Sequence, residues 1–144
     1  MEKFRKNGRG IKFFSVKNSA ILIARNERIK RYAESLEHRG DVIRYRICER
    51  LDAGVFDRID PVDIRSEYFD RDAGGSLWES DVWVEFESGE KAVREIIDPR
   101  ALSKQATIEQ LELSRRYWAA LGVYDWRIVV LETAQTEEGD DYVF

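Results

Sequence analysis

Two acidic residues, Asp81 and Glu95, lie in a stretch whose alternating pattern is that of a β-hairpin. Asp81 begins one predicted strand, and Glu95 lies inside the next. If the chain turns at Ser88, each acid is seven residues from the turn, so the two face each other across the strands. Two carboxylates in this position suit Mg²⁺, which binds oxygen ligands and keeps several waters. Such an ion supports phosphodiester hydrolysis, because it polarises a phosphoryl oxygen and lowers the pKa of a bound water.

The acid pair is not specific by itself, since the chain has 28 acidic residues and a hairpin can carry ordinary acids at its strand ends. The register has separate support. A turn at Ser88 also places Glu85 opposite Lys91, and cross-strand pairs of opposite charge stabilise a sheet. In this register Trp83 shares the face of Asp81, because side chains alternate along a strand.

The elements around this hairpin predict one α/β (α+β) domain with a central mixed sheet flanked by helices. A short hairpin, a helix and a further strand precede it, and a helix and a strand follow it. Residues 41–56 fit either a short strand or the start of a helix, followed by a turn at 52–54. The predicted bounds are 11–14 and 20–24 for the short hairpin, 26–39 for the first helix, 62–69 for the strand, 70–75 for a turn, 103–121 for the second helix and 127–132 for the last strand.

The second helix and the strand after it are the most regular elements. The helix should end at Gly122, a common stop residue. The strand at 127–132 is mostly apolar and is predicted to be buried on both faces. A helix of this length can bring that strand parallel to the hairpin. The predicted buried face of the helix consists of Ile108, Leu111, Ser114, Trp118 and Leu121.

Composition excludes several classes of protein. With 144 residues, 43% of them hydrophobic, the chain predicts one globular domain with a core. No segment has the pattern of a signal peptide or the length of a membrane span, so a cytoplasmic protein is expected. A single cysteine, Cys48, cannot form an internal disulfide, which agrees with that compartment. A net charge of −4 means that any DNA-binding face must be local.

The two ends of the chain differ from its middle. Residues 1–10 are basic and contain glycines, which predicts a flexible arm that could touch phosphates. Residues 11–133 form the single predicted domain. Residues 134–144 are acidic and predict a tail, which could itself be an interaction segment.

Several motifs resemble those of the PD-(D/E)XK nuclease superfamily, as does the order of the elements. Ser80–Val84 resembles its strand in which an aspartate precedes hydrophobic residues, and Val93–Pro99 resembles its second motif strand. In particular, the chain resembles the N-terminal nuclease domain of TnsA, the endonuclease subunit of heteromeric bacterial transposases. In that domain, a helix that ends in Tyr-Trp and a later Gly follows the motif. A strand of the Trp-Arg-Ile-Val type comes after it. Arg116–Gly122 and Asp125–Val130 match this, so the resemblance covers about residues 78–132.

The resemblance implies a metal-dependent DNA endonuclease from a transposition system or another mobile element. Asp81 and Glu95 would bind Mg²⁺ or Mn²⁺, and the partners would be DNA and a transposase or other mobile-element protein. The family also carries an acid on its first core helix. Tyr32–Glu37 is loosely similar to that segment, which makes Glu34 the candidate for this acid and Glu37 its rival.

One position departs from the family pattern. The family has a lysine two residues after its second acid, which helps to orient the attacking water, and this chain has Ile97 there. If the strand is aligned on its trailing proline instead, the lysine position falls on Asp98. Glu95 would then leave the metal-facing row, because a shift of one residue reverses the face of every side chain. Lys104, which begins the next helix, could replace the lysine, and Gln105 is a neutral substitute.

Two functions therefore remain open. The first is a TnsA-like endonuclease, with Lys104 as its displaced lysine and Arg115 and Arg116 as a phosphate-binding face. The second is an inactive relative that keeps the fold and binds DNA or a transposase or phage partner. The likeness could also be architectural only, since one fold hosts many functions. The two arginines could be ordinary helix charges, and Trp83 could stack on a base or pack under the hairpin.

Overall fold

The computed structural model describes residues 10–69 and 79–132. Residues 1–9 of the predicted arm, the predicted turn at 70–75 and the acidic tail at 134–144 lie outside the described residues. None of the helices in the described segments has the length and apolar character needed to cross a membrane. The elements are, in chain order, β1 (Ile11–Ser15), β2 (Ala20–Ala24), α1 (Glu27–Glu37), β3 (Val42–Arg50), the 3₁₀ turns η1 (Ala53–Arg58) and η2 (Ser66–Phe69), β4 (Glu79–Phe86), β5 (Lys91–Ile97), the 3₁₀ turn η4 (Pro99–Ala101), α2 (Gln105–Ala120) and β6 (Asp125–Val130).

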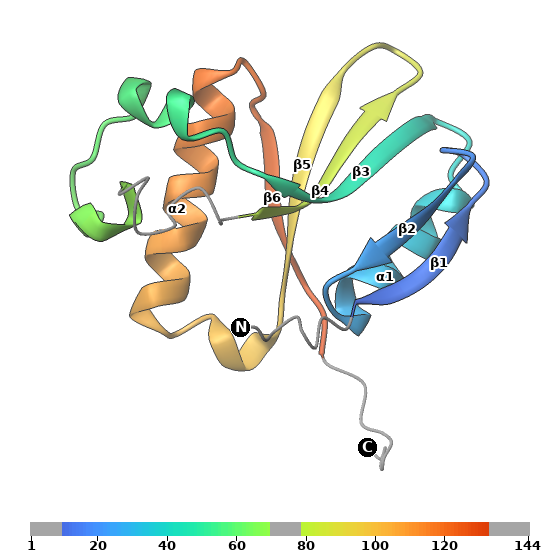
Figure 1. The fold of residues 1–144 in the computed structure, drawn as a ribbon, viewed down its shortest axis with the longest axis horizontal. Helices are drawn as coiled ribbons and strands as arrows, with labels where there is room; N and C mark the ends of the chain where they lie inside the picture. Colours follow the sequence, from blue (N-terminus) through green and yellow to red (C-terminus); the bar gives the residue numbers. More distant parts are fainter. Residues whose placement is uncertain (1–9, 70–78, 133–144) are drawn as a thin grey trace.

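A four-stranded mixed sheet forms the centre of the fold (Figure 1). Its strand order is β3-β4-β5-β6, in which β4 is antiparallel to both neighbours and β5 is parallel to β6. The helix α2 connects the two parallel strands, since such strands need a crossover. The predicted α/β fold, with a central mixed sheet, flanking helices and a parallel last strand, is therefore confirmed.

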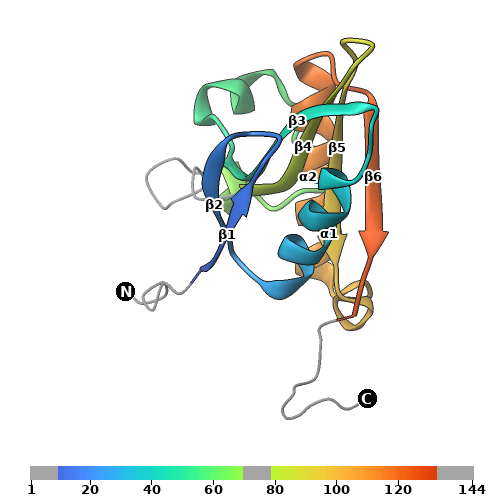
Figure 2. The same ribbon diagram turned by 90° about the vertical axis from the view of Figure 1, so that its right-hand side faces the viewer.

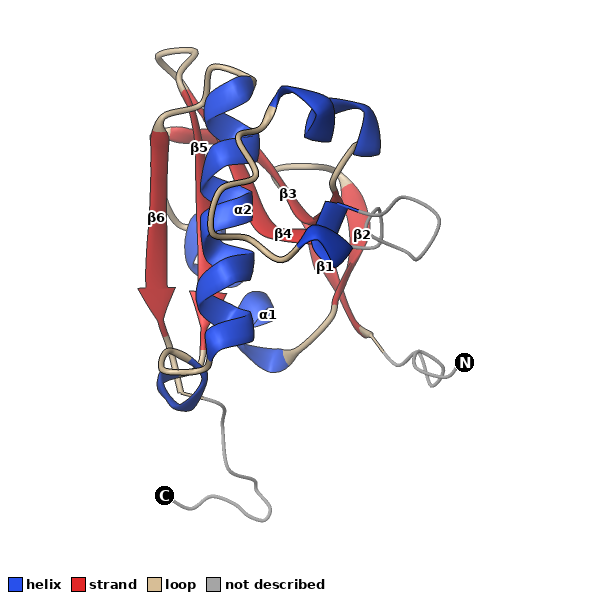
Figure 3. Cartoon of the chain, turned by 90° about the vertical axis from the view of Figure 1, so that its left-hand side faces the viewer, coloured by secondary structure: helices blue, strands red, loops and turns tan. Residues whose placement is uncertain are grey.

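The sheet is covered on both faces. Figure 2 shows α1 and the β1–β2 hairpin in front of one face, and Figure 3 shows α2 in front of the other. Each side has its own core. Val82 and Val84 of β4 pack with the buried residues of α1, whereas Trp83 packs with Leu113 and Trp118 of α2. Because successive side chains of a strand point to opposite faces, β4 contributes to both cores.

The predicted register of the acidic hairpin is confirmed. β4 and β5 pair Val82 with Arg94 and Glu85 with Lys91, which is the register of a turn centred on Ser88. Gly89 in this turn has a φ of 90°, a left-handed value that glycine adopts without a steric penalty. The register brings residues 81 and 95 to the same level of the sheet.

The prediction of a strand at residues 62–69 is wrong. Asp63 has a φ of 64°, which interrupts an extended backbone. The segment then continues into η2. The Arg65 amide donates a hydrogen bond to the carboxylate of Glu109 on α2 (2.9 Å), so a helix side chain satisfies it instead of a neighbouring strand. Alternation of residue types was therefore not sufficient to form a strand here.

Two other strands differ from prediction in extent or burial. The ambiguous stretch at 41–56 begins with the nine-residue strand β3, and its helix-like spacing reflects η1, which follows. The prediction that the last strand is buried on both faces is wrong, because Ile128 and Val130 are 40% and 48% exposed. β6 is the edge strand of the sheet. Leu113 of α2 packs over the inner strands, against Trp83 and Val93.

The buried face of α2 is rotated from the predicted one. Ile108 and Leu121, both predicted to be buried, are 47% and 42% exposed. Glu109 is buried on this helix because it accepts hydrogen bonds from Arg65, and apolar periodicity cannot reveal such a polar contact. The residues that α2 buries are Glu109, Leu113, Ser114, Tyr117 and Trp118.

The first helix begins where the sequence predicts. Asn26 caps it by accepting a hydrogen bond from the Ile29 amide (3.0 Å). Ile29, Ala33 and Leu36 are buried against the sheet, which confirms most of the predicted apolar face.

Glu37, at the last position of α1, belongs to a polar cluster that joins the helix to β1 and β3. Its carboxylate accepts hydrogen bonds from the hydroxyls of Ser15 and Tyr45, both at 2.5 Å, and from the Lys17 amide at 3.2 Å. Burial alone would raise the pKa of Glu37, but the hydrogen bonds from Ser15, Tyr45 and the Lys17 amide, together with the Lys17 charge, hold that pKa below its ordinary value. This rival for the accessory acid therefore has a structural role.

Replacing Glu37 by glutamine should destabilise the protein and make its free energy of unfolding less dependent on pH in the acidic range. A carboxyl group whose pKa is lowered by folding contributes stability above its unfolded pKa and loses it as the pH falls through the folded pKa. We expect Glu37→Gln to lower the free energy of unfolding at pH 7 by about 1–2 kcal/mol, measured by urea unfolding. The variant should then lose less stability than wild type between about pH 5 and pH 3. Glu34→Gln, on an exposed part of the same helix, should change the value at pH 7 by less than about 0.5 kcal/mol; equal losses would contradict the prediction.

Candidate functional site

Asp81 and Glu95 lie side by side on β4 and β5, on the face of the sheet covered by α2. The Asp81 amide donates to Oε1 of Glu95 (2.9 Å), and the Ile96 amide donates to Oδ2 of Asp81 (2.8 Å). Each acid therefore accepts a hydrogen bond from a backbone amide of the opposite strand. Both residues are only 5% exposed. The structure thus brings together the two acids that the sequence singles out.

Ser114 of α2 orients Glu95. Its hydroxyl donates to Oε2 of Glu95 (2.6 Å) and accepts from Nε1 of Trp126 (2.9 Å). Nε1 of Trp118 donates to the hydroxyl of Ser80 (2.6 Å), which lies 3.4 Å from the Ser114 hydroxyl. The two tryptophans of the motif segments after the hairpin therefore hold the hydroxyl groups next to Glu95.

Glu95 is electrostatically perturbed. Burial raises its pKa to about 8, and the neighbouring Asp81 carboxylate adds to the increase. Hydrogen bonds from the Ser114 hydroxyl and the Asp81 amide act in the opposite direction but do not cancel it. Two buried carboxylates this close repel each other when both are ionised, and a bound cation would relieve that repulsion.

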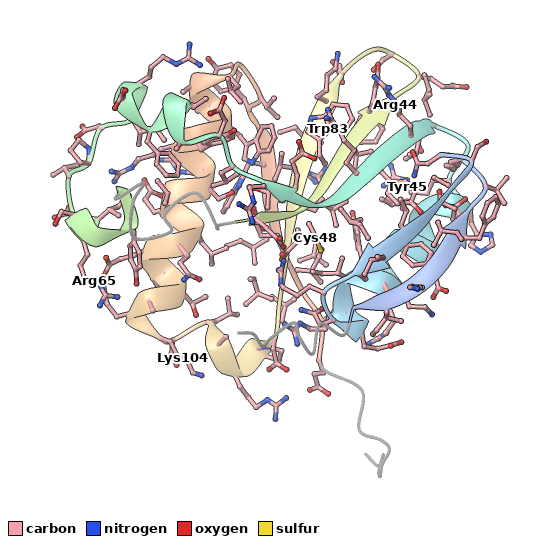
Figure 4. All side chains as sticks on the ribbon, in the orientation of Figure 1. Arg44, Tyr45, Cys48, Arg65, Trp83 and Lys104 are labelled. Atoms are coloured by element: carbon pink, nitrogen blue, oxygen red, sulfur yellow. The ribbon has the colours of Figure 1, made fainter. Side chains whose placement is uncertain are left out.

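The acid pair borders a pocket of about 180 Å³ at the end of the sheet where β4 begins and β5 ends. Its walls come from the start of α1, the two acidic strands and the first half of α2. Cys48, labelled in Figure 4, lies beside it, since the charges of Arg25, Glu79 and Asp81 act on its thiol. Besides the acid pair and Ser114, the polar lining consists of Arg25, Asn26, Arg28, Glu79, Thr107 and Gln110.

Sequence reasoning missed Arg25 and Glu79 at this pocket. Nη1 of Arg25 donates to Oε1 of Glu79 (2.5 Å), and its Nη2 donates to Oδ1 of Asp81. Glu79 was detectable, because residues two apart on a strand share a face. Arg25 was not, because it lies 56 residues before Asp81 and only the packing of β2 and α1 beside β4 brings it there.

Ile97 lies in the row of Glu95 and lines the pocket, where the family pattern would place a lysine. Asp98 does not face the acids. It caps η4 by accepting from the Arg100 amide (2.8 Å), and it binds the Arg100 guanidinium (2.8 Å). Glu95 and Ile97 therefore share the pocket side of β5, whereas Asp98 is not part of the pocket lining.

The other predicted acid and the predicted lysine lie elsewhere. Lys104 precedes α2 as its N-terminal capping residue, and its side chain is exposed at that end of the helix (Figure 4). Gln105 donates to Glu109 of its own helix (2.9 Å). Glu34 is half exposed and pairs with Lys30 (3.0 Å). None of these three side chains is part of the pocket lining.

The predicted phosphate-contact residues have internal partners. Arg115 and Arg116 both bind the carboxylate of Glu112, and Arg116 also donates to the carbonyl oxygens of Asp60 and Val62. Arg116 thus joins α2 to the turn before η2, which is a structural role. These arginines also lie outside the pocket lining.

Trp83 is packed rather than presented to solvent. It is 5% exposed, and the Arg46 guanidinium carbon lies 4.0 Å from the centre of its ring. Arg44 lies on the same side at 5.8 Å (Figure 4). Of the two roles open for this residue, the structure therefore shows packing under the hairpin.

The acid pair fits Mg²⁺ or Mn²⁺ in its chemistry. The two acids present four carboxylate oxygens beside the pocket, and hard divalent ions favour oxygen ligands. Within residues 10–69 and 79–132, no group of three or more His, Cys, Asp or Glu side chains is arranged to hold a metal. Waters and a phosphate oxygen would therefore have to complete the coordination, as is usual for Mg²⁺.

Replacing Ser114 by alanine should destabilise the protein through the site itself. The change leaves Oε2 of Glu95 and Nε1 of Trp126 without their partner. Because unsatisfied buried polar groups cost about 1–3 kcal/mol, we expect the free energy of unfolding to fall by about 2 kcal/mol in urea denaturation. Ser103→Ala, an exposed serine before the same helix, is the control and should stay within about 0.5 kcal/mol of wild type. Equal stability of the two variants would show that this network is not needed.

Comparison with known proteins adds no family to this geometry. The sequence matches no protein-family model, and it matches no curated protein. What can be said of function therefore depends on the residues of the site and on the order of the elements that hold them.

Proposed function

We propose that this protein is a divalent-metal-dependent DNA endonuclease of the PD-(D/E)XK type, similar to TnsA. The observation that carries the proposal is the pairing of Asp81 and Glu95 on adjacent strands, buried and next to a polar pocket. Burying two neighbouring carboxylates is costly even with one cationic partner, which here is Arg25 at Asp81. Perturbed acids at a pocket are typical of functional sites.

The order of the elements supports the same proposal. A helix precedes three antiparallel strands, and a crossover helix leads to a parallel fourth strand, with both acids on the central hairpin. The segments that resemble TnsA also contribute to the acid pair. Trp118 and Trp126 hold Ser80 and Ser114, and Ser114 binds Glu95. The motif resemblance therefore has a physical basis in the positioning of Glu95.

In this proposal each residue has a defined task. Asp81 and Glu95 hold the divalent ion, and Ser114 keeps Glu95 oriented toward it. When bound, the ion polarises the phosphoryl oxygen and makes a water more acidic. In the hydrolysis the water oxygen bonds to phosphorus and one ester P–O bond breaks. One proton of the water ends on the departing alcohol and the other on the product phosphate, which releases it to solvent.

A second function is supported by one specific observation. Ile97 is apolar and stands in the row of Glu95, so none of the described lining residues is a lysine that could orient the water. A protein with this site could keep the fold and bind DNA or a transposase or other mobile-element partner without cleaving. Such a binding module would use the same pocket surface but perform no chemistry.

Nicking of supercoiled plasmid DNA distinguishes the two functions. Purified protein should convert supercoiled plasmid to the open circular form with Mg²⁺ or Mn²⁺ and should not do so with EDTA. Absence of nicking with either ion, combined with retained binding to DNA in a gel-shift assay, would favour the binding module. If the protein neither nicks nor binds DNA, DNA is not its substrate.

A further inference from the structure

Within the described segments, Arg25 is a basic residue that contacts the acid pair directly, through Asp81. Its guanidinium bridges Glu79 and Asp81 of β4. The backbone at this point is held on both sides, because Ala24 is completely buried and Asn26 caps α1. The side chain is less restrained, since 46% of its surface is exposed. Arg25 therefore has a fixed backbone, whereas its guanidinium group is partly exposed and can move.

The positively charged side chains that line the pocket come from the start of α1 and the residue before its cap, and not from β5. Among the described residues, Arg25 and Arg28 are its basic lining residues, and none of the lining residues is a lysine. Arg28 lies 3.9 Å from Asp98, which directly follows β5 and also binds Arg100. Ile97 leaves the position of the family lysine without charge. Among the described lining residues, Arg25 is thus the cation placed to act where Asp81 and a phosphate would meet.

The two oxygens of Asp81 have different partners. Oδ2 accepts the Ile96 amide, whereas Oδ1 accepts Nη2 of Arg25. The amide bond is part of the sheet framework and cannot leave without opening it. The bond to Arg25 can leave without opening the sheet, because it joins two side chains and the Arg25 side chain is 46% exposed. A divalent ion that binds Asp81 would therefore compete with Arg25 for Oδ1.

We propose that Arg25 is an exchangeable cation of this site, which binds Asp81 in the metal-free protein and the substrate phosphate once a divalent ion has replaced it. The phosphate half of this inference rests on the proposed function. Guanidinium suits both partners, because its planar fork of N–H donors matches the oxygens of carboxylate and of phosphate. The exchange would also account for a site that lacks the lysine on β5.

Metal and DNA binding test the exchange without relying on cleavage. Titration calorimetry with Mn²⁺, in the absence of DNA, should show that Arg25→Met binds the ion about tenfold more tightly than wild type, because the competing charge is gone. Fluorescence anisotropy with a labelled DNA duplex in Ca²⁺ should show weaker binding by the variant, by about fivefold, because one phosphate contact is lost. If Arg25 had a purely structural role, its replacement would instead weaken both Mn²⁺ binding and DNA binding.

Two further variants complete the experiment. Arg39→Met removes an exposed arginine that pairs with Asp41 after the same helix, and it should leave both affinities unchanged. Arg25→Gln is a second neutral replacement, which must give the same two changes and serves if Arg25→Met does not fold. Unchanged or weaker Mn²⁺ binding in the Arg25 variants, or no Mn²⁺ binding by any of the proteins, overturns the exchange.

The outcomes also separate this inference from the proposed function. If wild type does not nick DNA but the Arg25 variants bind Mn²⁺ more tightly and DNA more weakly, the endonuclease fails and the exchange stands. If wild type nicks DNA and neither affinity changes in the variants, the endonuclease stands and the exchange fails.

Discussion

Replacing Asp81 by asparagine should reduce metal-dependent nicking of plasmid DNA by about a thousandfold. Asparagine has the same shape and can still accept the Ile96 amide, so the fold should survive. It lacks the negative charge that would hold a divalent ion. Metal stabilisation of a phosphoryl transition state is worth several kcal/mol, and about 4 kcal/mol corresponds to a thousandfold in rate. The measurement is the initial rate of open-circle formation in Mg²⁺ and in Mn²⁺.

The control for this variant is Asp41→Asn. Asp41 is an exposed aspartate that pairs with Arg39 in the turn before β3, away from the pocket. Its removal should leave the nicking rate within about twofold of wild type, because surface ion pairs contribute little. Both variants should unfold near the wild-type urea concentration. If Asp81→Asn nicks at the wild-type rate, Asp81 is not a metal ligand and any activity belongs to another site or to a contaminant.

Replacing Leu113 by alanine should cause the largest loss of stability among the substitutions considered. Leu113 is completely buried where α2 meets the sheet, in the cluster with Trp83, Val93 and Trp118. Removing a buried leucine side chain costs about 2–5 kcal/mol, because the transfer free energy is lost and a cavity remains. We expect about 3 kcal/mol in urea unfolding and a melting temperature lower by roughly 10 °C.

Ile108→Ala on the same helix is the matched comparison. Apolar periodicity assigns Ile108 to the buried face, whereas the structure leaves it 47% exposed. The substitution should therefore cost less than about 0.5 kcal/mol, since alanine also favours the helix. A loss at Ile108 equal to that at Leu113 would mean that α2 packs in the orientation suggested by its sequence pattern and not in the one described.

The hairpin register was predictable because it follows from a local rule. A turn at one residue fixes every cross-strand pair, and the pairing of Glu85 with Lys91 gave an independent check. The same reasoning brought Asp81 opposite Glu95. The parallel position of the last strand followed from the length of the crossover helix. These inferences concern residues that are close in sequence or joined by one regular element.

The failures concern contacts between distant segments. Residues 62–69 alternate as a strand does, but the Arg65 amide finds its partner on α2, and no local pattern signals that bond. The burial of β6 depends on its place at the edge of the sheet, which its own apolar sequence does not reveal. The buried face of α2 includes Glu109, a polar residue bonded to Arg65, which apolar periodicity does not signal.

The candidate site divides in the same way. The sequence by itself determined the acid pair, its register and the isoleucine two residues after Glu95, because all three lie on one hairpin. Only the tertiary structure placed Arg25 at Asp81 and left Lys104, before the first turn of α2, outside the pocket lining. The reason is physical: hairpin geometry is fixed by backbone pairing between neighbours in sequence, whereas the charge beside the acids is decided by how β2, α1 and α2 pack around the sheet.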